Sequence, residues 1–312
     1  MIRCLVIDEM HPSLKSLLRE TGVQIDYEPD LLPAEVAAAL AEKPYEGLIV
    51  RSKVRVTADL LRHGPHLRFV ARAGAGVDNI DVAALTAAGV TLVNAPEGNS
   101  QAVGEFAVGT LLALLRKVAA ADAEVRQEQW RREANRGYEL QARTVGIIGC
   151  GHMGRSFARC LRGFGCTVLG HDHDPAVQPT EYLPLVPLEE IQQRCDVLSI
   201  HIPYSPENHA FVNEELLRGF RQPLWLLNTA RGEVLDHAAL VKLLQEGKLR
   251  GAALDVLDNE RLTTLKPEQR TRFGWLRAAP NVVLTPHVGG WTHESYQRIN
   301  EVLARKIGEL VK

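Results

Sequence analysis

Short apolar runs alternate along the chain with segments whose apolar residues recur at helical spacing. The runs are rich in Val, Ile and Leu and are bounded by Gly, Pro or Asp, a pattern typical of strands buried on both faces of a parallel sheet. The segments between them are predicted to form amphipathic helices. This alternation favours an α/β fold with right-handed crossovers. The expected strands are residues 4–8, 23–27, 47–51, 67–71, 91–94, 145–148, 166–171, 196–201, 224–228, 252–256 and 282–285. The expected helices are residues 13–20, 33–41, 58–61, 82–88, a long one starting near Ser100, 155–165, 238–245 and 294–312.

A glycine-rich turn joins the strand at residues 145–148 to the helix that follows it. Its pattern is Gly149-x-Gly151-x-x-Gly154, and Asp172 comes at the end of the next strand. Gly149 permits the sharp turn, Gly151 lets the backbone approach a pyrophosphate, and Gly154 lets the helix pack closely on the strand. A carboxylate at position 172 can accept hydrogen bonds from ribose hydroxyls and would repel a 2′-phosphate. The pattern therefore predicts a binding site for NAD rather than NADP.

Composition and charge narrow the class of protein further. The chain has 312 residues, of which 46% are hydrophobic, and a net charge of −2. Its length favours two domains, and its charge indicates neither nucleic acid nor a membrane as partner. The five cysteines are scattered and none forms a C-x-x-C motif, so we expect reduced thiols in a cytoplasmic protein. The run from His171 to Asp174 contains metal-ligand types, but its alternation along a strand points neighbouring side chains to opposite faces, and we expect no metal.

Three polar residues follow expected strands of the second half of the chain. Arg231 lies in NTARGEV, Glu260 lies in ALDVLDNE, and His287 lies in LTPHVGG. The carboxyl ends of parallel strands form the edge at which open α/β sheets bind ligands. Each residue alone could be a surface ion pair, a loop charge or a turn residue. Their shared position beside an NAD site favours a catalytic group.

These motifs belong to a longer series of blocks that resembles the D-isomer-specific 2-hydroxyacid dehydrogenase family. The series covers essentially the whole chain: Arg51-Ser52, ARAGAGVDNID, NAPEGNS, the glycine turn with Asp172, NTARGEV, ALDV with its following Glu, and TPHVGG. The expected fold is two doubly wound parallel-sheet domains with the active site between them. A flavodoxin-like substrate-binding domain would comprise residues 1–99 and 286–312, and a Rossmann NAD-binding domain residues 100–285.

The resemblance also implies roles for individual residues. His287 would exchange the hydroxyl proton, Glu260 would hold its ring and favour the imidazolium, and Arg231 would bind the substrate carboxylate. Asp255 would receive the nicotinamide carboxamide. The residues expected to bind the cofactor are Gly149, Gly151, His152, Met153, Gly154, Asp172, Ile202, Pro203, Thr229, Ala230, Asp255, Gly289 and Gly290. The residues expected to bind the substrate are Arg51, Ser52, Arg72, Gly74, Ala75, Gly76 and Asn99.

The substrate is expected to be 3-phospho-D-glycerate, at the entry to serine synthesis, because Arg51 and Arg72 could bind its phosphate. Two alternatives stay open: a glyoxylate or hydroxypyruvate reductase, and an NAD-sensing corepressor that binds peptides. The Pro that usually follows the catalytic Glu is Arg261 here, and residues 261–279 are longer than usual and border the site. The long helix and the region 100–130 are expected to form a homodimer interface, although the apolar stripe of the helix could equally belong to the core of the monomer.

Overall fold

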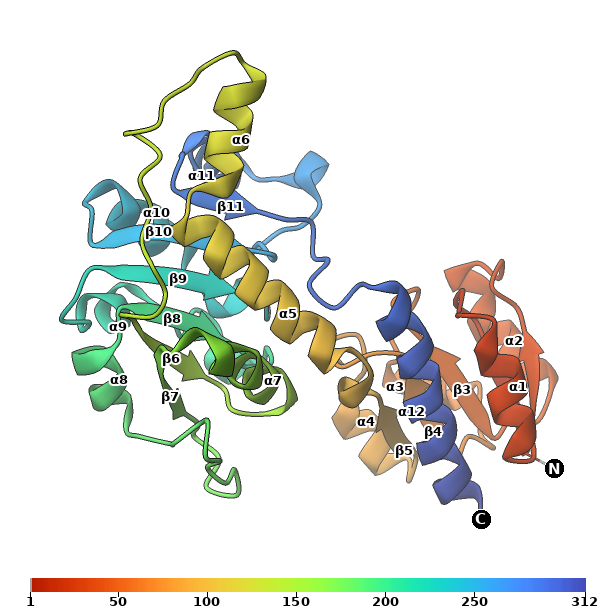
Figure 1. Ribbon diagram of the computed structural model, residues 1–312. Coiled ribbons are helices and arrows are strands. Elements are labelled where there is room, and N and C mark those ends of the chain that lie inside the picture. Colours follow the sequence, from red (N-terminus) through yellow and green to blue (C-terminus); the bar gives the residue numbers. More distant parts are fainter. Residues whose placement is uncertain (1) are drawn as a thin grey trace. The chain divides into compact units, whose positions relative to one another are not determined.

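The computed structural model describes residues 2–312, and the chain divides into two units, each built around its own sheet (Figure 1). Unit 1 comprises the chain through Ser100 together with Trp291–Lys312, and unit 2 comprises Gln101–Gly290. Each unit contains one sheet in which every strand pairing is parallel. The prediction of two parallel-sheet α/β domains is therefore confirmed. The second boundary falls at Gly290, whereas the sequence placed it at residue 285, so His287 belongs to unit 2.

The sheet of unit 1 has the strand order β2-β1-β3-β4-β5. The direction of winding reverses between β1 and β3, which neighbour each other in the sheet. Its strands are β1 (Ile2–Val6), β2 (Val23–Tyr27), β3 (Gly47–Val50), β4 (Phe69–Arg72) and β5 (Thr91–Asn94). Its helices are α1 (Ser13–Glu20), α2 (Val36–Glu42), α3 (Ala58–Arg62), α4 (Val82–Ala87) and α12 (His293–Val311).

Successive residues of β1 point to opposite faces of this sheet, as the pleat requires. Cys4 and Val6 pack in a core with α1 and α12, whereas Leu5 and Ile7 pack in a core with α2, α3 and α4. Helices thus cover both faces, which explains why the strands read as nearly continuous apolar runs. The last helix of the chain therefore completes the first unit.

The sheet of unit 2 has the order β11-β10-β9-β8-β6-β7, and its winding reverses between β6 and β8. One core packs α5 and α7 against the sheet, and the other packs α8, α9, α10 and α11. Its strands are β6 (Thr144–Ile148), β7 (Thr167–His171), β8 (Val197–Ile200), β9 (Leu224–Asn228), β10 (Leu249–Leu254) and β11 (Val282–Leu284). Its helices are α5 (Pro96–Leu115, which begins in unit 1), α6 (Val118–Arg126), α7 (His152–Leu161), α8 (Leu188–Arg194), α9 (Glu214–Arg218), α10 (His237–Gln245) and α11 (Pro267–Ala278).

Several segments differ from the sequence-based expectation. Helix α5 begins at Pro96 rather than near Ser100, because proline suits a first helical position. The expected helix at 33–41 divides into a 3₁₀ turn and α2. The first strand ends at Val6, which leaves Asp8 in the following loop. The long segment 261–279 is folded: it contains α11, whose Leu276 is 2% exposed and belongs to the core of unit 2.

None of the helices formed by residues 2–312 is long and apolar enough to cross a membrane. The five cysteines are free thiols that differ in burial. Cys4, Cys150 and Cys195 are buried, and Cys160 and Cys166 are half-buried. Burial raises the pKa of the Cys150 thiol to about 12, so this residue of the glycine turn is a poor nucleophile at neutral pH.

Candidate functional site

The glycine turn between β6 and α7 has the geometry that its three glycines require. Gly149 has a φ of +92°, and a Cβ there would lie 2.7 Å from the His201 backbone. A Cβ at Gly154 would lie 2.0 Å from the carbonyl oxygen of Gly149, so only glycine allows α7 to pack this closely. At Gly151 no atom lies within 4 Å of the Cβ position. The turn therefore leaves open space where a pyrophosphate would approach the start of α7.

Asp172 lies directly after β7, and its carboxylate stabilises the glycine turn through hydrogen bonds. Its carboxylate accepts hydrogen bonds from the backbone N–H groups of Cys150 at 2.6 Å and Asp174 at 3.0 Å. The side chain is about 10% exposed. A carboxylate can accept more than two hydrogen bonds, so Asp172 retains capacity for a ribose hydroxyl. The turn and this carboxylate fit the adenosine half of NAD.

The other expected cofactor residues lie at the same carboxyl edge of the unit 2 sheet, in loops or at the start of α7. The Thr229 hydroxyl oxygen, after β9, is buried without a hydrogen-bond partner. Such an orphaned polar atom indicates a missing partner. His152 and Met153 form the first residues of α7, and Ile202 follows β8. The remaining expected cofactor residues of this edge are Pro203, Ala230, Gly289 and Gly290.

His287 and Glu260 are brought together by the loops after β11 and β10. His287 Nδ1 lies 2.9 and 3.0 Å from the two Glu260 carboxylate oxygens. Since a carboxylate only accepts hydrogen bonds, Nδ1 carries the proton and a neutral ring presents Nε2 as an acceptor. His287 also has a φ of +56°, a left-handed conformation that is uncommon outside glycine. Both side chains are nearly half exposed.

Asp255 holds the His287 loop in place. This residue is 3% exposed, and its carboxylate accepts hydrogen bonds from the Thr285 hydroxyl at 2.7 Å and the backbone N–H groups of Val288 at 3.0 Å and Gly289 at 2.7 Å. The backbone N–H of His287 donates to the Asp255 carbonyl at 2.8 Å. The sequence indicated Asp255 as a cofactor ligand but did not reveal these bonds, because they join residues thirty positions apart.

Arg231 begins a tight turn after β9. Buried Asn228 organises this turn: its amide donates to the Arg231 carbonyl at 2.9 Å, and its oxygen accepts from the Ala230 N–H at 3.0 Å. A Cβ at Gly232 would lie 2.0 Å from the Leu257 carbonyl group, so the turn presses against the loop that carries Glu260. Three loops of unit 2 thus meet through their backbones. The Asn in NTARGEV is the local signal in the sequence for this role of Asn228.

The expected substrate residues of unit 1 lie at the carboxyl ends of β3 and β4. A Cβ at Gly74, whose φ is +144°, would lie 1.6 Å from Arg72 Nη1, so this guanidinium folds against the glycine loop. The Ala75 carbonyl accepts a hydrogen bond from Asn94 at 2.8 Å. Asn99 lies in the first turns of α5, and its side-chain oxygen is buried without a partner. Ser52 and Gly76 are the remaining expected residues of these loops.

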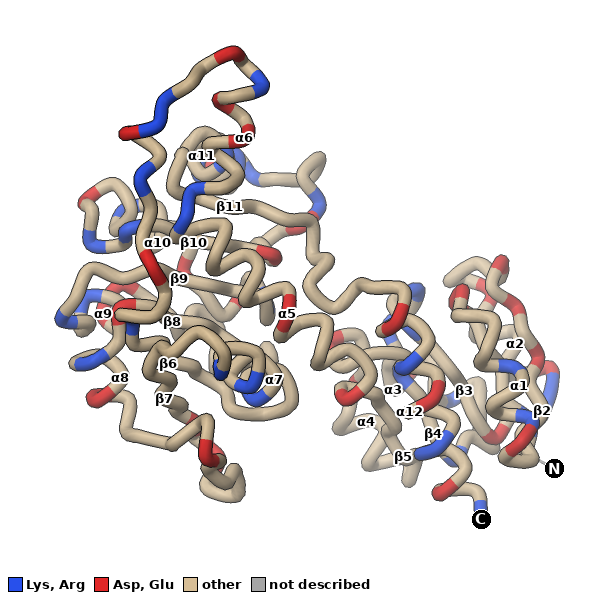
Figure 2. The backbone as a smooth tube through the Cα atoms, viewed as in Figure 1, with Lys and Arg blue, Asp and Glu red and all other residues tan. Residues whose placement is uncertain are grey.

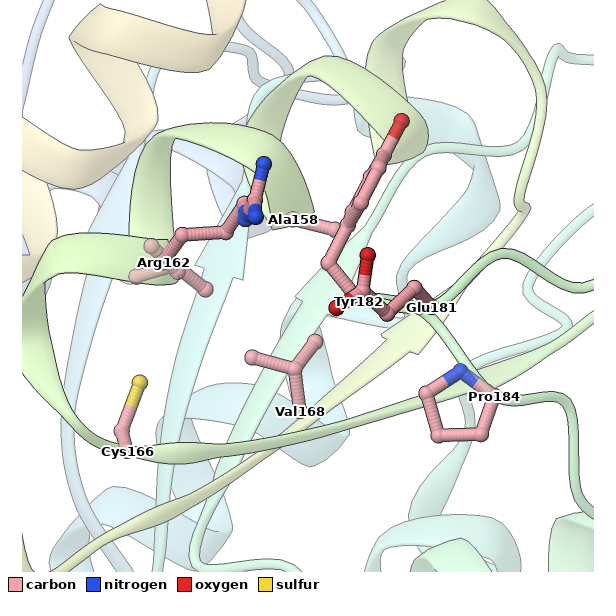
Figure 3. Close-up of a pocket in the computed structure, with 8 residues that line it drawn as sticks. Ala158, Arg162, Cys166, Val168, Glu181, Tyr182 and Pro184 are labelled. Atoms are coloured by element: carbon pink, nitrogen blue, oxygen red, sulfur yellow. The ribbon is translucent and has the colours of Figure 1, made fainter.

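Other features of the surface do not coincide with these loops. A pocket of about 310 Å³ lies between the end of α7 and the start of β7, lined by Arg162, Cys166 and Tyr182 among others (Figure 3). It is therefore at the opposite end of β7 from Asp172. Lys and Arg alternate with Asp and Glu along both units (Figure 2). Within residues 2–312, no cluster of three or more His, Cys, Asp or Glu side chains is arranged to hold a metal ion.

Residues 108–289 match the family model described as D-isomer specific 2-hydroxyacid dehydrogenase, NAD binding domain. The chain is 34% identical to human D-3-phosphoglycerate dehydrogenase over 312 residues, which are 99% of this chain and 56% of that protein. It is 31% identical to D-3-phosphoglycerate dehydrogenase of Methanocaldococcus jannaschii, covering all of this chain and 58% of that one. The chain thus spans little more than half the length of these relatives.

Solved structures resemble the whole chain. The TT0316 protein from Thermus thermophilus is 32% identical with a TM-score of 0.81, covering 97% of this chain and 94% of that one. D-lactate dehydrogenase from Aquifex aeolicus, complexed with NAD and lactic acid, is 26% identical with a TM-score of 0.81, covering 99% and 95%. The match to an NAD-binding domain agrees with the glycine turn and Asp172.

Proposed function

Because the chain belongs to the D-isomer-specific 2-hydroxyacid dehydrogenase family, we propose that it interconverts a D-2-hydroxy acid and its 2-oxo acid with NAD. The observation that carries this proposal is the hydrogen-bonded pair of His287 and Glu260 at the carboxyl edge of the unit 2 sheet. NAD, when bound, would accept the hydride from the substrate carbon. The glycine turn, Asp172 and Thr229 would hold it.

The side chains of the protein would handle the proton and the carboxylate of the substrate. His287 Nε2 takes the hydroxyl proton during oxidation and returns it during reduction. Glu260 accepts the Nδ1–H bond, which orients the ring, and its negative charge stabilises the imidazolium. The planar guanidinium of Arg231 matches a carboxylate and would bind it through two parallel N–H groups. Backbone N–H groups of Gly74, Ala75 and Gly76 would assist in binding this anion.

Substitution of the proposed base tests this assignment. His287→Ala should lower kcat by about 10²–10⁴-fold, the usual contribution of a positioned general base, while NAD binding measured by calorimetry stays intact. His66→Ala, which removes an exposed imidazole in unit 1, is the matched control and should retain activity. Equal kcat values in His287→Ala and the wild type would reject the catalytic role, and retained cellular function in His287→Ala would favour a binding protein of the corepressor type.

The proposed substrate is 3-phospho-D-glycerate, oxidised to 3-phosphohydroxypyruvate in serine synthesis. Two things support it: the relatives named D-3-phosphoglycerate dehydrogenase at 34% identity, and the arginines Arg51 and Arg72 at the ends of neighbouring strands of unit 1. A doubly charged phosphate requires such cations. A steady-state panel of 2-oxo acids with NADH tests the proposal. It predicts a higher kcat/KM for 3-phosphohydroxypyruvate than for hydroxypyruvate, glyoxylate or pyruvate, and the reverse order would identify a simple reductase.

We also propose a homodimer formed by α6 and the adjoining segment. In Figure 1, α6 and the loop after it extend away from the sheet of unit 2. Exposed apolar side chains gather there: Val118 is 54%, Val125 51% and Trp130 84% exposed. A second copy would remove this apolar surface from water. Sedimentation velocity should show a dimer for the wild type and a shift towards monomer for Trp130→Asp, and a monomeric wild type would reject the proposal.

A further inference from the structure

An aromatic cluster surrounds Arg51 in unit 1. The guanidinium carbon of Arg51 lies 4.0 Å from the centre of the Trp291 ring and 5.6 Å from that of Tyr296. The two rings contact each other with centroids 5.2 Å apart, and His11 meets Tyr296 edge-on at 5.6 Å. Trp291 and Tyr296 flank the start of α12, whereas Arg51 follows β3. We call these four residues the Arg51 cluster.

The stack with Trp291 leaves the hydrogen-bonding edge of Arg51 available. The guanidinium carbon lies over the Trp291 ring at 4.0 Å from its centre, and a guanidinium that stacks on a ring keeps its N–H groups, which lie in its plane, available. Among residues 2–312, no carboxylate forms a salt bridge with Arg51, although several other arginines of unit 1 have one. The cation is half-buried and held in orientation without being neutralised. That state suits a group that receives an anion from outside the protein.

The backbone at Arg51 is fixed as well. The carboxylate of buried Asp8 accepts hydrogen bonds from the N–H groups of Arg51 at 2.7 Å and Lys53 at 3.2 Å. The Asn79 amide contacts the carbonyl oxygens of Arg51 at 3.4 Å and Val54 at 2.9 Å. The main chain alone does not orient a long arginine side chain, whose aliphatic torsions remain to be restricted. Trp291, the nearer of the two aromatic neighbours, restricts them.

Core packing does not account for Trp291. The side chain is 49% exposed, so much of its apolar surface remains in water. It follows the Gly289-Gly290 pair of the catalytic loop and precedes Thr292, the N-cap of α12. It comes four positions after His287 in the chain, which limits the distance between their Cα atoms to about 14 Å whatever the arrangement of the two units. A short stretch of chain therefore ties Trp291 to the residue that we propose exchanges the proton.

We propose that Trp291 is a positioning residue that orients the Arg51 guanidinium to bind the anionic group at the far end of the substrate. This inference rests on the proposed function, because it requires a substrate with a second anionic group such as a phosphate. Trp291 touches neither the substrate carboxylate nor the reacting carbon in this role. It sets the preference for a phosphorylated over an unphosphorylated 2-oxo acid by holding one cation in place.

The test compares two substitutions at this position. Trp291→Leu removes the ring but keeps apolar bulk, and Trp291→Phe keeps an aromatic face. For Trp291→Leu, KM for 3-phosphohydroxypyruvate should rise by about 3- to 10-fold, between the values expected of an exposed and a desolvated cation–π contact, with kcat unchanged. KM for hydroxypyruvate, which lacks the phosphate, should not change. Trp291→Phe should restore most of the lost affinity, which a merely structural role for the indole would not explain.

A double-mutant cycle with Arg51→Ala tests whether Trp291 acts through Arg51. Together with the substrate preference of the wild type, it distinguishes an error in this inference from an error in the substrate assignment. If Trp291 acts through Arg51, Trp291→Leu has no further effect in the Arg51→Ala background. Full additivity of the two substitutions, or an equal rise in KM for both 2-oxo acids in Trp291→Leu, would overturn the inference while leaving the substrate assignment intact. A wild type that does not prefer the phosphorylated substrate would instead reject the substrate assignment, and the orienting role with it.

Discussion

In both units, a buried carboxylate after one strand accepts hydrogen bonds from the backbone of the loop after the neighbouring strand. The two loops held in this way carry different chemical groups. In unit 1, Asp8 follows β1 and accepts the backbone N–H of Arg51 in the loop after the neighbouring strand β3. In unit 2, Asp255 follows β10 and accepts backbone N–H groups next to His287 in the loop after the neighbouring strand β11. Both carboxylates are buried, at 7% and 3% exposure.

The difference lies in what each loop presents. The unit 1 loop presents a cation stacked on an aromatic ring, and the unit 2 loop presents an imidazole paired with a carboxylate. Burying a carboxylate costs free energy unless several hydrogen-bond donors contact it. In both units the loop provides these donors, and the hydrogen bonds hold the loop in one conformation. The comparison indicates that the sheets provide a frame for rigid loops and that the residue carried by each loop decides its chemistry.

Among the residues that hold the two loops, the largest effect is expected at Asp255. Asp255→Asn places an amide where the Gly289 N–H now donates, and that N–H loses its acceptor. The left-handed backbone of His287 would then be free to relax, and a displacement of about 1 Å can cost about 10²-fold in rate. We expect kcat to fall by about 10²-fold. Asp258→Asn, in the same loop but bonded to Gln269 and Arg272 of α11, is the control. A rise in KM for NAD with unchanged kcat would assign Asp255 to the cofactor alone.

Acid should destabilise unit 2 before unit 1. Burial lowers the pKa of His201 to about 4, so its contribution to stability is complete above pH 6.5 and is lost as the pH falls towards 4. At pH 5 the loss is about 2 kcal/mol. In unit 1, burial alone would raise the pKa of Asp26, but hydrogen bonds from Tyr45, Lys43 and Arg3 lower it to about 2. Its contribution is present above pH 4 and lost between pH 4 and 2.

Hydrogen exchange with mass spectrometry at pH 7, 5 and 3, corrected for the intrinsic exchange rate, resolves the two units. Protection in β8 and β9 should fall by pH 5, while protection in β1 and β2 should persist until below pH 4. His201→Gln should flatten the response of unit 2 between pH 7 and 5. Simultaneous loss in both units at pH 5, or no change in His201→Gln, would show that these two groups do not govern the acid response.

The smallest effect is expected at Asp8. Asp8→Asn weakens the bonds to the N–H groups of Arg51 and Lys53, but Trp291 still holds the guanidinium. We expect KM for 3-phosphohydroxypyruvate to rise by up to about 10-fold with little change in kcat. Glu9→Gln, at the exposed neighbouring carboxylate, is the control. A fall in kcat as large as that of Asp255→Asn would remove the distinction between the two units.

Local patterns in the sequence predicted much of the fold. The β–α alternation predicted the strands and most helices, because burial on both sheet faces leaves a strong apolar signal. The spacing of Gly149, Gly151 and Gly154 predicted a sharp turn, an open approach and close packing, and each glycine has that environment. Helices α6, α8, α9 and α11 were not predicted, since they are short or polar on most sides. Their positions depend on packing against the rest of unit 2.

By itself, the sequence determined two parallel sheets, a dinucleotide turn and the identity of the polar residues at strand ends, because periodicity and turn chemistry act between near neighbours in the chain. Only the tertiary structure decided that Nδ1 of His287 meets both oxygens of Glu260, that Asp255 and Asp8 hold the loops, and that Arg51 stacks on Trp291. These contacts join segments far apart in the sequence, and the order of strands in each sheet brings them together.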